Sequence, residues 1–258
     1  MNWIHAVIFG AVEGITEFLP VSSTGHLILT ARLLGLPQTE MMKSFEIAIQ
    51  LGAMLAVVCL YWRSFLLEWK TLQRVLAAFL PTAVIGFFFY HVIKKFLFAG
   101  ESTVLWALAI GGIVLILFDL WYRERPDAIR DVARIPFLKA AGIGTAQSLA
   151  VIPGVSRSAA TILGALLLGV ERKKAVEFSF LLAVPTLLAA TALDLVKSSS
   201  AFAQNDWRML FLGGSVSFVV AMVSIRAFLS FVQKQKHALL CFGVYRLLAA
   251  ALFWVFVK

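Results

Sequence analysis

Long apolar runs separated by short polar segments make up most of this chain. Six of the runs are long enough to cross about 30 Å of hydrocarbon as helices. They occupy residues 45–62, 75–93, 102–122, 175–196, 207–231 and 238–257. The pattern predicts an all-α, polytopic membrane protein with six transmembrane helices, in which residues 1–258 form a single domain.

Two further segments, 1–36 and 136–170, are apolar at both ends and polar in the middle. Their interruptions are LPVSSTG at 19–25 and IPGVSRS at 152–158, and each combines a proline with several hydroxyl side chains. At membrane depth, an open backbone is tolerated only where protein or a water-filled cavity satisfies the freed polar groups. We interpret both segments as re-entrant helix hairpins, and two kinked full spans are the alternative.

The two interrupted segments align with one another. A shift of 134 positions places GAVEGITEFLPVSSTGHLI (10–28) on GTAQSLAVIPGVSRSAATI (144–162) without a gap. Identical pairs are Gly10 with Gly144, Val21 with Val155, Ser22 with Ser156, and Ile28 with Ile162. Three predicted spans separate the hairpins, so the halves, roughly 1–122 and 136–258, would be inverted relative to each other. An inverted repeat whose broken helices meet near the midplane is typical of transporter folds.

Composition supports the membrane assignment. Apolar residues make up 61% of the chain and charged residues only 14%, which is far from the balance of a soluble domain. The net charge of +9 would favour nucleic acid in a soluble protein. Here, however, Lys and Arg lie in short loops, where they set orientation and meet anionic headgroups. We therefore expect membrane lipids as partners and no nucleic acid.

The loop cations predict an orientation. With both hairpins re-entrant, one side of the membrane collects thirteen cations: Arg63, Lys70, Arg74, Arg123, Arg125, Arg130, Arg134, Lys139, Arg172, Lys173, Lys174, Lys234 and Lys236. The other side collects seven: Arg32, Lys43, Lys94, Lys95, Lys197, Arg208 and Lys258. The positive-inside rule places the larger set in the cytoplasm. Both termini and the opening of the first hairpin would then lie outside, and the count would change if either hairpin spanned.

Two glutamates, Glu13 and Glu17, precede the first interruption. Four positions apart on a helix, their carboxylates share one face, and two like charges in a low dielectric need a compensating cation or proton. Mg²⁺ and Ca²⁺ both take carboxylate oxygens, and Mg²⁺ usually shares one or two carboxylates with substrate phosphates. The pair predicts a site for Mg²⁺ or Ca²⁺, and a protonated, hydrogen-bonded glutamate is the alternative.

Ser22, Ser23, Thr24 and His26 follow where a half-helix would begin. A helix N-terminus binds phosphate readily, and capping explains only one of the three hydroxyls. His26 lies within helical reach of both serines, and a hydroxyl beside an imidazole is typical of an activated nucleophile. Three schemes stay open: Ser23 attacks with His26 as its base, His26 attacks while Glu17 orients it, or a metal activates water. We favour Ser23.

The second interruption adds a cation. Ser156 can cap the following half-helix, and Arg157 projects from its start, inside the membrane, where a positive charge is costly and usually functional. The guanidinium fork matches phosphate oxygens, and Thr161 shares its helix face. A salt bridge from Arg157 to Glu13 or Glu17 is the structural alternative. Carboxylates, hydroxyls, a helix terminus and an arginine together describe a phosphoryl-transfer site.

The remaining intramembrane charges are less informative. Asp119, Asp194, Arg226 and Arg246 lie within or at the ends of predicted spans. We expect them to pair with neighbours or reach the interface. Glu46 and Gln50 are predicted to support the site without taking part in the chemistry.

At these residues the chain resembles a known family. The stretches EGITEFLPVSSTGHL, FEIAIQLGAMLAVV and GTAQSLAVIPGVSRSAATILGALLLGVERKKAVEFSFLLAVP are similar to the undecaprenyl-diphosphate phosphatase, or bacitracin-resistance, family of bacterial inner membranes. The resemblance implies hydrolysis of undecaprenyl diphosphate to undecaprenyl phosphate and inorganic phosphate, which recycles the lipid carrier of peptidoglycan synthesis. It also implies dependence on Mg²⁺ or Ca²⁺. Its essential positions correspond here to Glu13, Glu17, Ser22, Ser23, His26, Ser156, Arg157 and Thr161.

A transporter for a polyprenyl phosphate is the competing function, because an inverted repeat suits it equally. A transporter has no need of a hydroxyl beside a histidine and a carboxylate pair, so the set favours hydrolysis of a polyprenyl diphosphate at an active site that faces the periplasm. We assign catalysis to Glu17, Ser23, His26 and Arg157, and phosphate binding to Ser22, Thr24, Ser156, Arg157 and Thr161. The oligomeric state stays open, a homodimer included.

Overall fold

The structure, a computed structural model, describes residues 1–37, 39–88, 101–198 and 206–257. Six helices in these ranges are long and apolar enough to cross a membrane: α3 (Glu40–Leu60), α5 (Trp69–Phe88), α7 (Glu101–Trp121), α10 (Arg172–Ser198), α11 (Asp206–Lys234) and α12 (Ala238–Val257). They correspond to the six predicted runs, although positions 89–93 of the second run lie outside the described residues. The chain is therefore an all-helical, multi-pass membrane protein, as predicted.

Four helices are too short to span the bilayer: α1 (Trp3–Thr16), α2 (Ser23–Leu33), α8 (Phe137–Gln147) and α9 (Arg157–Leu167). The last three have 11 residues each, which corresponds to about 16 Å, or roughly half of the hydrocarbon thickness. We call α1 and α2 the first helix pair, and α8 and α9 the second helix pair. Short helical turns complete the fold: α4 (Trp62–Leu66), η1 (Val132–Arg134) and η2 (Ser148–Val151).

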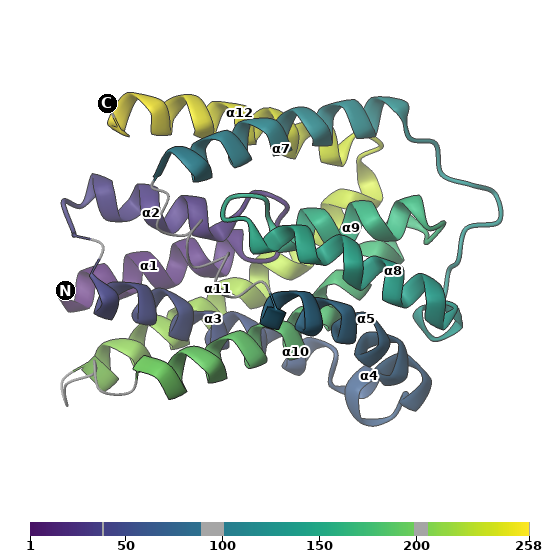
Figure 1. Ribbon diagram of the computed structural model, residues 1–258, viewed down its shortest axis with the longest axis horizontal. Coiled ribbons are helices and arrows are strands. Elements are labelled where there is room, and N and C mark those ends of the chain that lie inside the picture. Colours follow the sequence, from purple (N-terminus) through teal and green to yellow (C-terminus); the bar gives the residue numbers. More distant parts are fainter. Residues whose placement is uncertain (38, 89–100, 199–205, 258) are drawn as a thin grey trace.

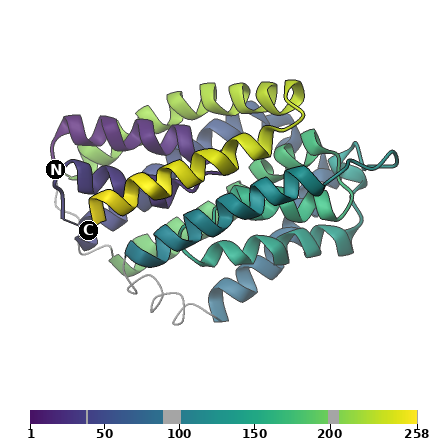
Figure 2. The ribbon, with the colours of Figure 1, turned by 90° about the horizontal axis from the view of Figure 1, so that it is seen from above.

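The two helix pairs open in opposite directions (Figure 1). The first pair opens toward the end of the molecule at which both chain termini lie. The second pair opens toward the other end, at which α4 and the connection from α7 to α8 are found. Seen from above, α7 and α12 run side by side across one face (Figure 2). The closed ends of the two pairs therefore lie in the interior of the bundle.

Each pair is broken by a short stretch without α-helix. The first break covers residues 17–22 and the second covers residues 148–156. Ser22 and Ser156 end the breaks and have φ values of 70° and 77°, and they are the only non-glycine residues with positive φ in the described part of the chain. This backbone costs an L-residue about 1–2 kcal/mol, so surrounding bonds must hold it in place. A shift of 134 positions places one of these serines on the other.

Glycines at aligned positions allow each short helix to approach a long one. Helix α1 packs against α11, and α8 packs against α5. A Cβ atom on Gly10 would overlap the carbonyl oxygen of Gly213, and one on Gly144 would overlap that of Ala78. The contacts are therefore backbone against backbone, and the Gly10 and Gly144 match in the sequence has a packing cause.

Candidate active site

The two breaks meet around a cavity of about 120 Å³. Its lining combines both breaks, the first residues of α2 and α9, and one residue each from α3 and α10: Glu17, Ser22, Ser23, Thr24, Ala150, Pro153, Gly154, Ser156, Arg157, Gln50 and Leu187. Most of the residues predicted from the sequence are therefore brought together, although they come from segments more than 100 positions apart. Glu13, His26 and Thr161 do not line the cavity.

Arg157 joins the two breaks through an ion pair. Its Nη2 donates to Glu17 Oε1 at 2.8 Å, and the side chains are only 11% and 5% exposed. Its Nη1 donates to the carbonyl oxygen of Ser179 at 3.0 Å, and the guanidinium lies 5.6 Å from the ring centre of Phe18. The salt bridge that the sequence offered as a structural alternative is thus present. The Nε of Arg157 is buried and has no hydrogen-bond partner among the described residues.

Ser23 contacts the other oxygen of the same carboxylate. Its Oγ donates to Glu17 Oε2 at 2.5 Å, a length typical of a charge-assisted bond between a hydroxyl and a carboxylate. A serine hydroxyl within hydrogen-bond reach of a buried base is the arrangement required of an activated nucleophile. In this structure the hydroxyl of Ser23 is therefore directed to Glu17 and not, as we expected, to His26.

His26 makes a different set of contacts. Its Nδ1 lies 2.8 Å from the carbonyl oxygen of Ser22, and its Nε2 lies 2.8 Å from the hydroxyl of Tyr245 on α12. The imidazole and phenol rings stack, with centres 5.5 Å apart and planes within 4° of parallel. Tyr245 was not among the residues predicted from the sequence, because it lies 219 positions from His26 and belongs to no local motif.

Two hydroxyls of the second helix pair have structural partners. Ser156 Oγ accepts from the backbone N–H of Ala159 at 3.2 Å, which is the predicted helix cap. Thr161 is fully buried, and its Oγ lies 3.0 Å from Gln147 Oε1 and 2.8 Å from the carbonyl oxygen of Arg157. Thr161 thus shares the helix of Arg157, but its hydroxyl does not reach the cavity.

Arg246, on α12, forms hydrogen bonds with both breaks. It is fully buried, and its Nε and both Nη atoms donate to five carbonyl oxygens, those of Leu108, Pro20, Val155, Ala107 and Gly154. These bonds use every N–H donor of a guanidinium. Ser158 adds a direct link, because its Oγ donates to the carbonyl oxygen of Leu19 at 2.7 Å. We expected Arg246 to pair with a neighbour, and its partners are backbone carbonyls of both breaks and of α7.

Glu13 is the deepest carboxylate of the site. It is fully buried, and neither of its oxygens has a hydrogen-bond partner among the described residues. Glu17, Glu46 and Arg157 lie close enough to act on it electrostatically. No group of three or more His, Cys, Asp or Glu residues in the described ranges has metal-binding geometry. The unpartnered oxygens of Glu13, with the remaining lone pairs of the Glu17 carboxylate, still fit a divalent cation that takes its other ligands from substrate phosphate and water.

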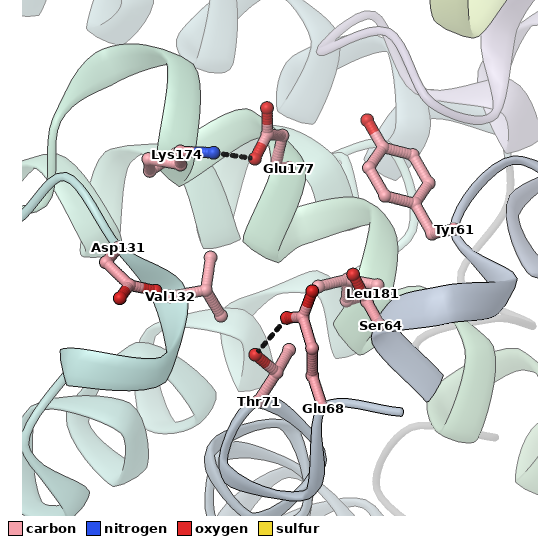
Figure 3. A pocket seen from close by; sticks show the side chains of 9 residues that line it. All are labelled: Tyr61, Ser64, Glu68, Thr71, Asp131, Val132, Lys174, Glu177 and Leu181. Carbon is pink, nitrogen blue, oxygen red and sulfur yellow. Dashed lines mark hydrogen bonds and ion pairs between the residues drawn. The ribbon is translucent and has the colours of Figure 1, made fainter. Parts of the chain in front are cut away.

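A second cavity, of about 170 Å³, lies farther along the bundle. Its lining is shown in Figure 3: Tyr61, Ser64, Glu68, Thr71, Asp131, Val132, Lys174, Glu177 and Leu181. Lys174 is already paired there with Glu177 at 2.6 Å. A series of ring contacts leads from this cavity toward the first one, because Tyr61 contacts Phe180 and Phe180 contacts Phe18, the neighbour of Glu17 in the sequence.

The fold and the cavity define a class of protein: a multi-pass helical membrane protein with a buried centre of hydroxyl, carboxylate and guanidinium groups. Residues 6–252 match the family described as bacitracin resistance protein BacA. The chain is 49% identical to an undecaprenyl-diphosphatase of Aquifex aeolicus over 98% of this chain and 97% of that protein. It is 46% identical to proteins of the same name from Sulfurihydrogenibium sp. and Persephonella marina, with at least 99% of each chain covered. The chain belongs to the BacA family, and the resemblance found in the sequence is confirmed.

Proposed function

We propose that the protein hydrolyses undecaprenyl diphosphate to undecaprenyl phosphate and inorganic phosphate at the cavity between the two breaks. This reaction recycles the lipid carrier of peptidoglycan synthesis and confers resistance to bacitracin. The relatives named undecaprenyl-diphosphatase support the reaction. The single structural observation that supports the site is Glu17, whose carboxylate contacts both the Ser23 hydroxyl and the Arg157 guanidinium.

In the proposed reaction, Ser23 Oγ attacks the terminal phosphorus while its proton passes to Glu17 Oε2. The bond between this phosphorus and the bridging oxygen breaks, and undecaprenyl phosphate leaves. Arg157 stabilises the developing charge on the phosphate oxygens, and its unpartnered Nε provides a donor for them. Water then attacks the phosphoserine, Glu17 returns its proton to Ser23 Oγ, and the displaced water proton leaves with inorganic phosphate. Ser22, Thr24 and Ser156 contribute hydroxyls to the binding of the phosphates.

Glu13 and Glu17 would hold the divalent cation, Mg²⁺ or Ca²⁺, which when bound neutralises negative charge on the diphosphate. The unpartnered oxygens of Glu13 support this assignment. Replacing Glu13 by glutamine removes one charged ligand while preserving side-chain size. We expect the variant to need a higher Mg²⁺ concentration for its half-maximal rate of phosphate release. A wild-type Mg²⁺ dependence would place the cation elsewhere.

We further infer that the helix pairs are re-entrant hairpins related by an inverted repeat. The register of 134 positions fits the helix bounds: α8 begins 134 positions after α1, and α9 begins and ends 134 positions after α2. The matched backbone of Ser22 and Ser156 supports the same relation. Under this topology, the side of the membrane that collects thirteen loop cations is cytoplasmic. The first helix pair then opens toward the periplasm, and so does the active site.

The test is phosphate release from undecaprenyl diphosphate by the purified full chain, with EDTA and after Mg²⁺ or Ca²⁺ is restored. Ser23→Ala and Glu17→Gln should abolish release. Ser224→Ala is the matched control, because its hydroxyl bonds to the carbonyl oxygen of Ile15, away from the cavity. If the wild-type protein releases no phosphate with any divalent ion, a lipid transporter becomes the better hypothesis.

Acid quench with substrate labelled in the terminal phosphate tests the nucleophile. We expect an acid-stable, base-labile adduct on Ser23 that is missing in Ser23→Ala. An acid-labile adduct would instead identify His26 as the attacking group. No adduct under any quench would favour direct attack by water and contradict the phosphoserine step.

A further inference from the structure

Both nitrogens of the His26 imidazole are occupied by hydrogen bonds. A carbonyl oxygen only accepts, so the short contact to Ser22 requires the proton to be on Nδ1. In the neutral ring, Nε2 then has the lone pair and accepts from the hydroxyl of Tyr245. The Ser22 carbonyl oxygen thereby selects the tautomer in which Nδ1–H points at the backbone of the first break, and the Tyr245 hydroxyl donates to the nitrogen on the opposite side of the ring.

This backbone is the strained part of the site. Ser22 has a φ of 70°, and its carbonyl oxygen accepts from both the backbone N–H and the Nδ1 of His26. The side chain of Ser22 makes no capping bond of its own, so the contacts with His26 hold its peptide group in place. Ser23, the next residue, owes the direction of its hydroxyl to that peptide group.

Without the hydroxyl, Nε2 loses its partner, and only the Ser22 carbonyl and the stacked ring remain to hold the imidazole. The ring could then turn toward a new partner for Nε2. The positive-φ turn would lose the Nδ1–H donor that stabilises it. Tyr245 itself stacks on His26, and the next residue along α12 is the fully buried Arg246.

We propose that Tyr245 is a positioning residue for the reaction: its hydroxyl fixes the orientation of the His26 ring, which fixes the Ser22 carbonyl and hence the Ser23 hydroxyl. The effect on turnover rests on the proposed function. The expected change in the reactivity of His26 does not depend on the proposed function, because it concerns only the hydrogen bond at Nε2. The test therefore combines a chemical probe of His26 with kinetics.

Tyr245→Phe removes the hydroxyl and keeps the stacked ring. Diethyl pyrocarbonate acylates unprotonated imidazole nitrogens, and mass spectrometry gives its rate at each histidine. We expect the rate at His26 to rise about fivefold in the variant, as for the loss of one ordinary hydrogen bond. The rate at His237, which lies near Asp119 and is half exposed, should not change and serves as an internal reference.

In the same variant we expect kcat for phosphate release to fall about tenfold while KM changes little, because the variant misdirects the Ser23 hydroxyl and leaves the phosphate-binding groups in place. Tyr122→Phe is the matched control. Its hydroxyl donates to the carbonyl oxygen of Leu166, far from His26. The acylation rate of His26 and kcat for phosphate release should therefore both stay at the wild-type values.

An unchanged acylation rate at His26 in Tyr245→Phe would overturn the proposal. A faster acylation with wild-type kcat would also overturn it, because the hydrogen bond would then exist without serving the reaction. If the wild-type protein releases no phosphate, the phosphatase proposal fails separately, and a wild-type acylation rate in the variant would still refute the hydrogen bond from Tyr245 to His26.

Discussion

Replacing Arg246 by lysine should destabilise the contact between the two breaks while preserving the positive charge. The guanidinium donates to five carbonyl oxygens: one from the first break, two from the second and two from α7. An ammonium group has three N–H donors, so at least two of these carbonyls lose their partner. A buried polar group left unpaired costs about 1–3 kcal/mol, so two of them cost about 2–6 kcal/mol.

The free energy of unfolding can be measured by titrating SDS into mixed micelles and following tryptophan fluorescence. Arg226→Lys is the matched control, because Arg226 lies on the exposed side of α11 and should change stability by less than about 0.5 kcal/mol. We expect Arg246→Lys to be less stable than this control by at least about 2 kcal/mol. Equal stability of the two variants would refute the view that Arg246 holds the breaks together.

Three further predictions follow from other contacts. Arg157→Lys keeps the positive charge but loses the planar guanidinium that can bind two phosphate oxygens at once, so kcat for phosphate release should fall by a factor of about 10² or more. A wild-type rate would show that Arg157 has only a structural role. Gly144→Ala should cost about 1–3 kcal/mol of unfolding free energy through overlap with α5, whereas Gly86→Ala, with no neighbour within 4 Å, should not destabilise. Thr161→Val removes the hydrogen bond to Gln147 and should lower the free energy of unfolding by about 1 kcal/mol without changing KM. A raised KM would support the original prediction that Thr161 binds phosphate.

The sequence predicted the long helices well, because an apolar run of about 20 residues has few alternatives in a bilayer. It also predicted that both shorter segments are interrupted, although the observed breaks, 17–22 and 148–156, begin earlier than the predicted interruptions at 19–25 and 152–158. Pro20 lacks a backbone N–H, and α1 ends before it, while α9 begins directly after the predicted cap at Ser156. These features are local, so a single segment contains the physical cause of each.

The partner of Ser23 was not predictable in the same way. Helical spacing places His26 one turn from Ser23, and this spacing does hold within α2. However, residues 17–22 leave the helix, and the break returns the chain so that Glu17, six positions earlier, reaches the Ser23 hydroxyl. The geometry of a non-helical break depends on tertiary bonds, and no periodicity in the sequence describes it.

Thr161 shows how helical spacing can mislead about direction. It lies four positions after Arg157 and therefore on the same face, but a threonine hydroxyl in a helix often bonds to the carbonyl of the preceding turn. Here it lies 2.8 Å from the Arg157 carbonyl oxygen and contacts Gln147. Tyr245 was missed, and the partners of Arg246 were not predicted, for a different reason: the partners of both residues lie on other segments of the chain, and only the tertiary fold brings them near.

The bonds between the breaks also bear on the transporter hypothesis. Alternating access requires one repeat to rock against the other around the bound ligand. In this structure Ser158 bonds to the carbonyl of Leu19, Arg157 is paired with Glu17, and Arg246 donates to both breaks. Moving the two breaks apart would separate the buried ion pair and break these hydrogen bonds, which leaves buried polar groups without partners. Hydrolysis needs only that a phosphate reaches Ser23 and that two products leave, so rigid breaks serve a phosphatase better than a transporter.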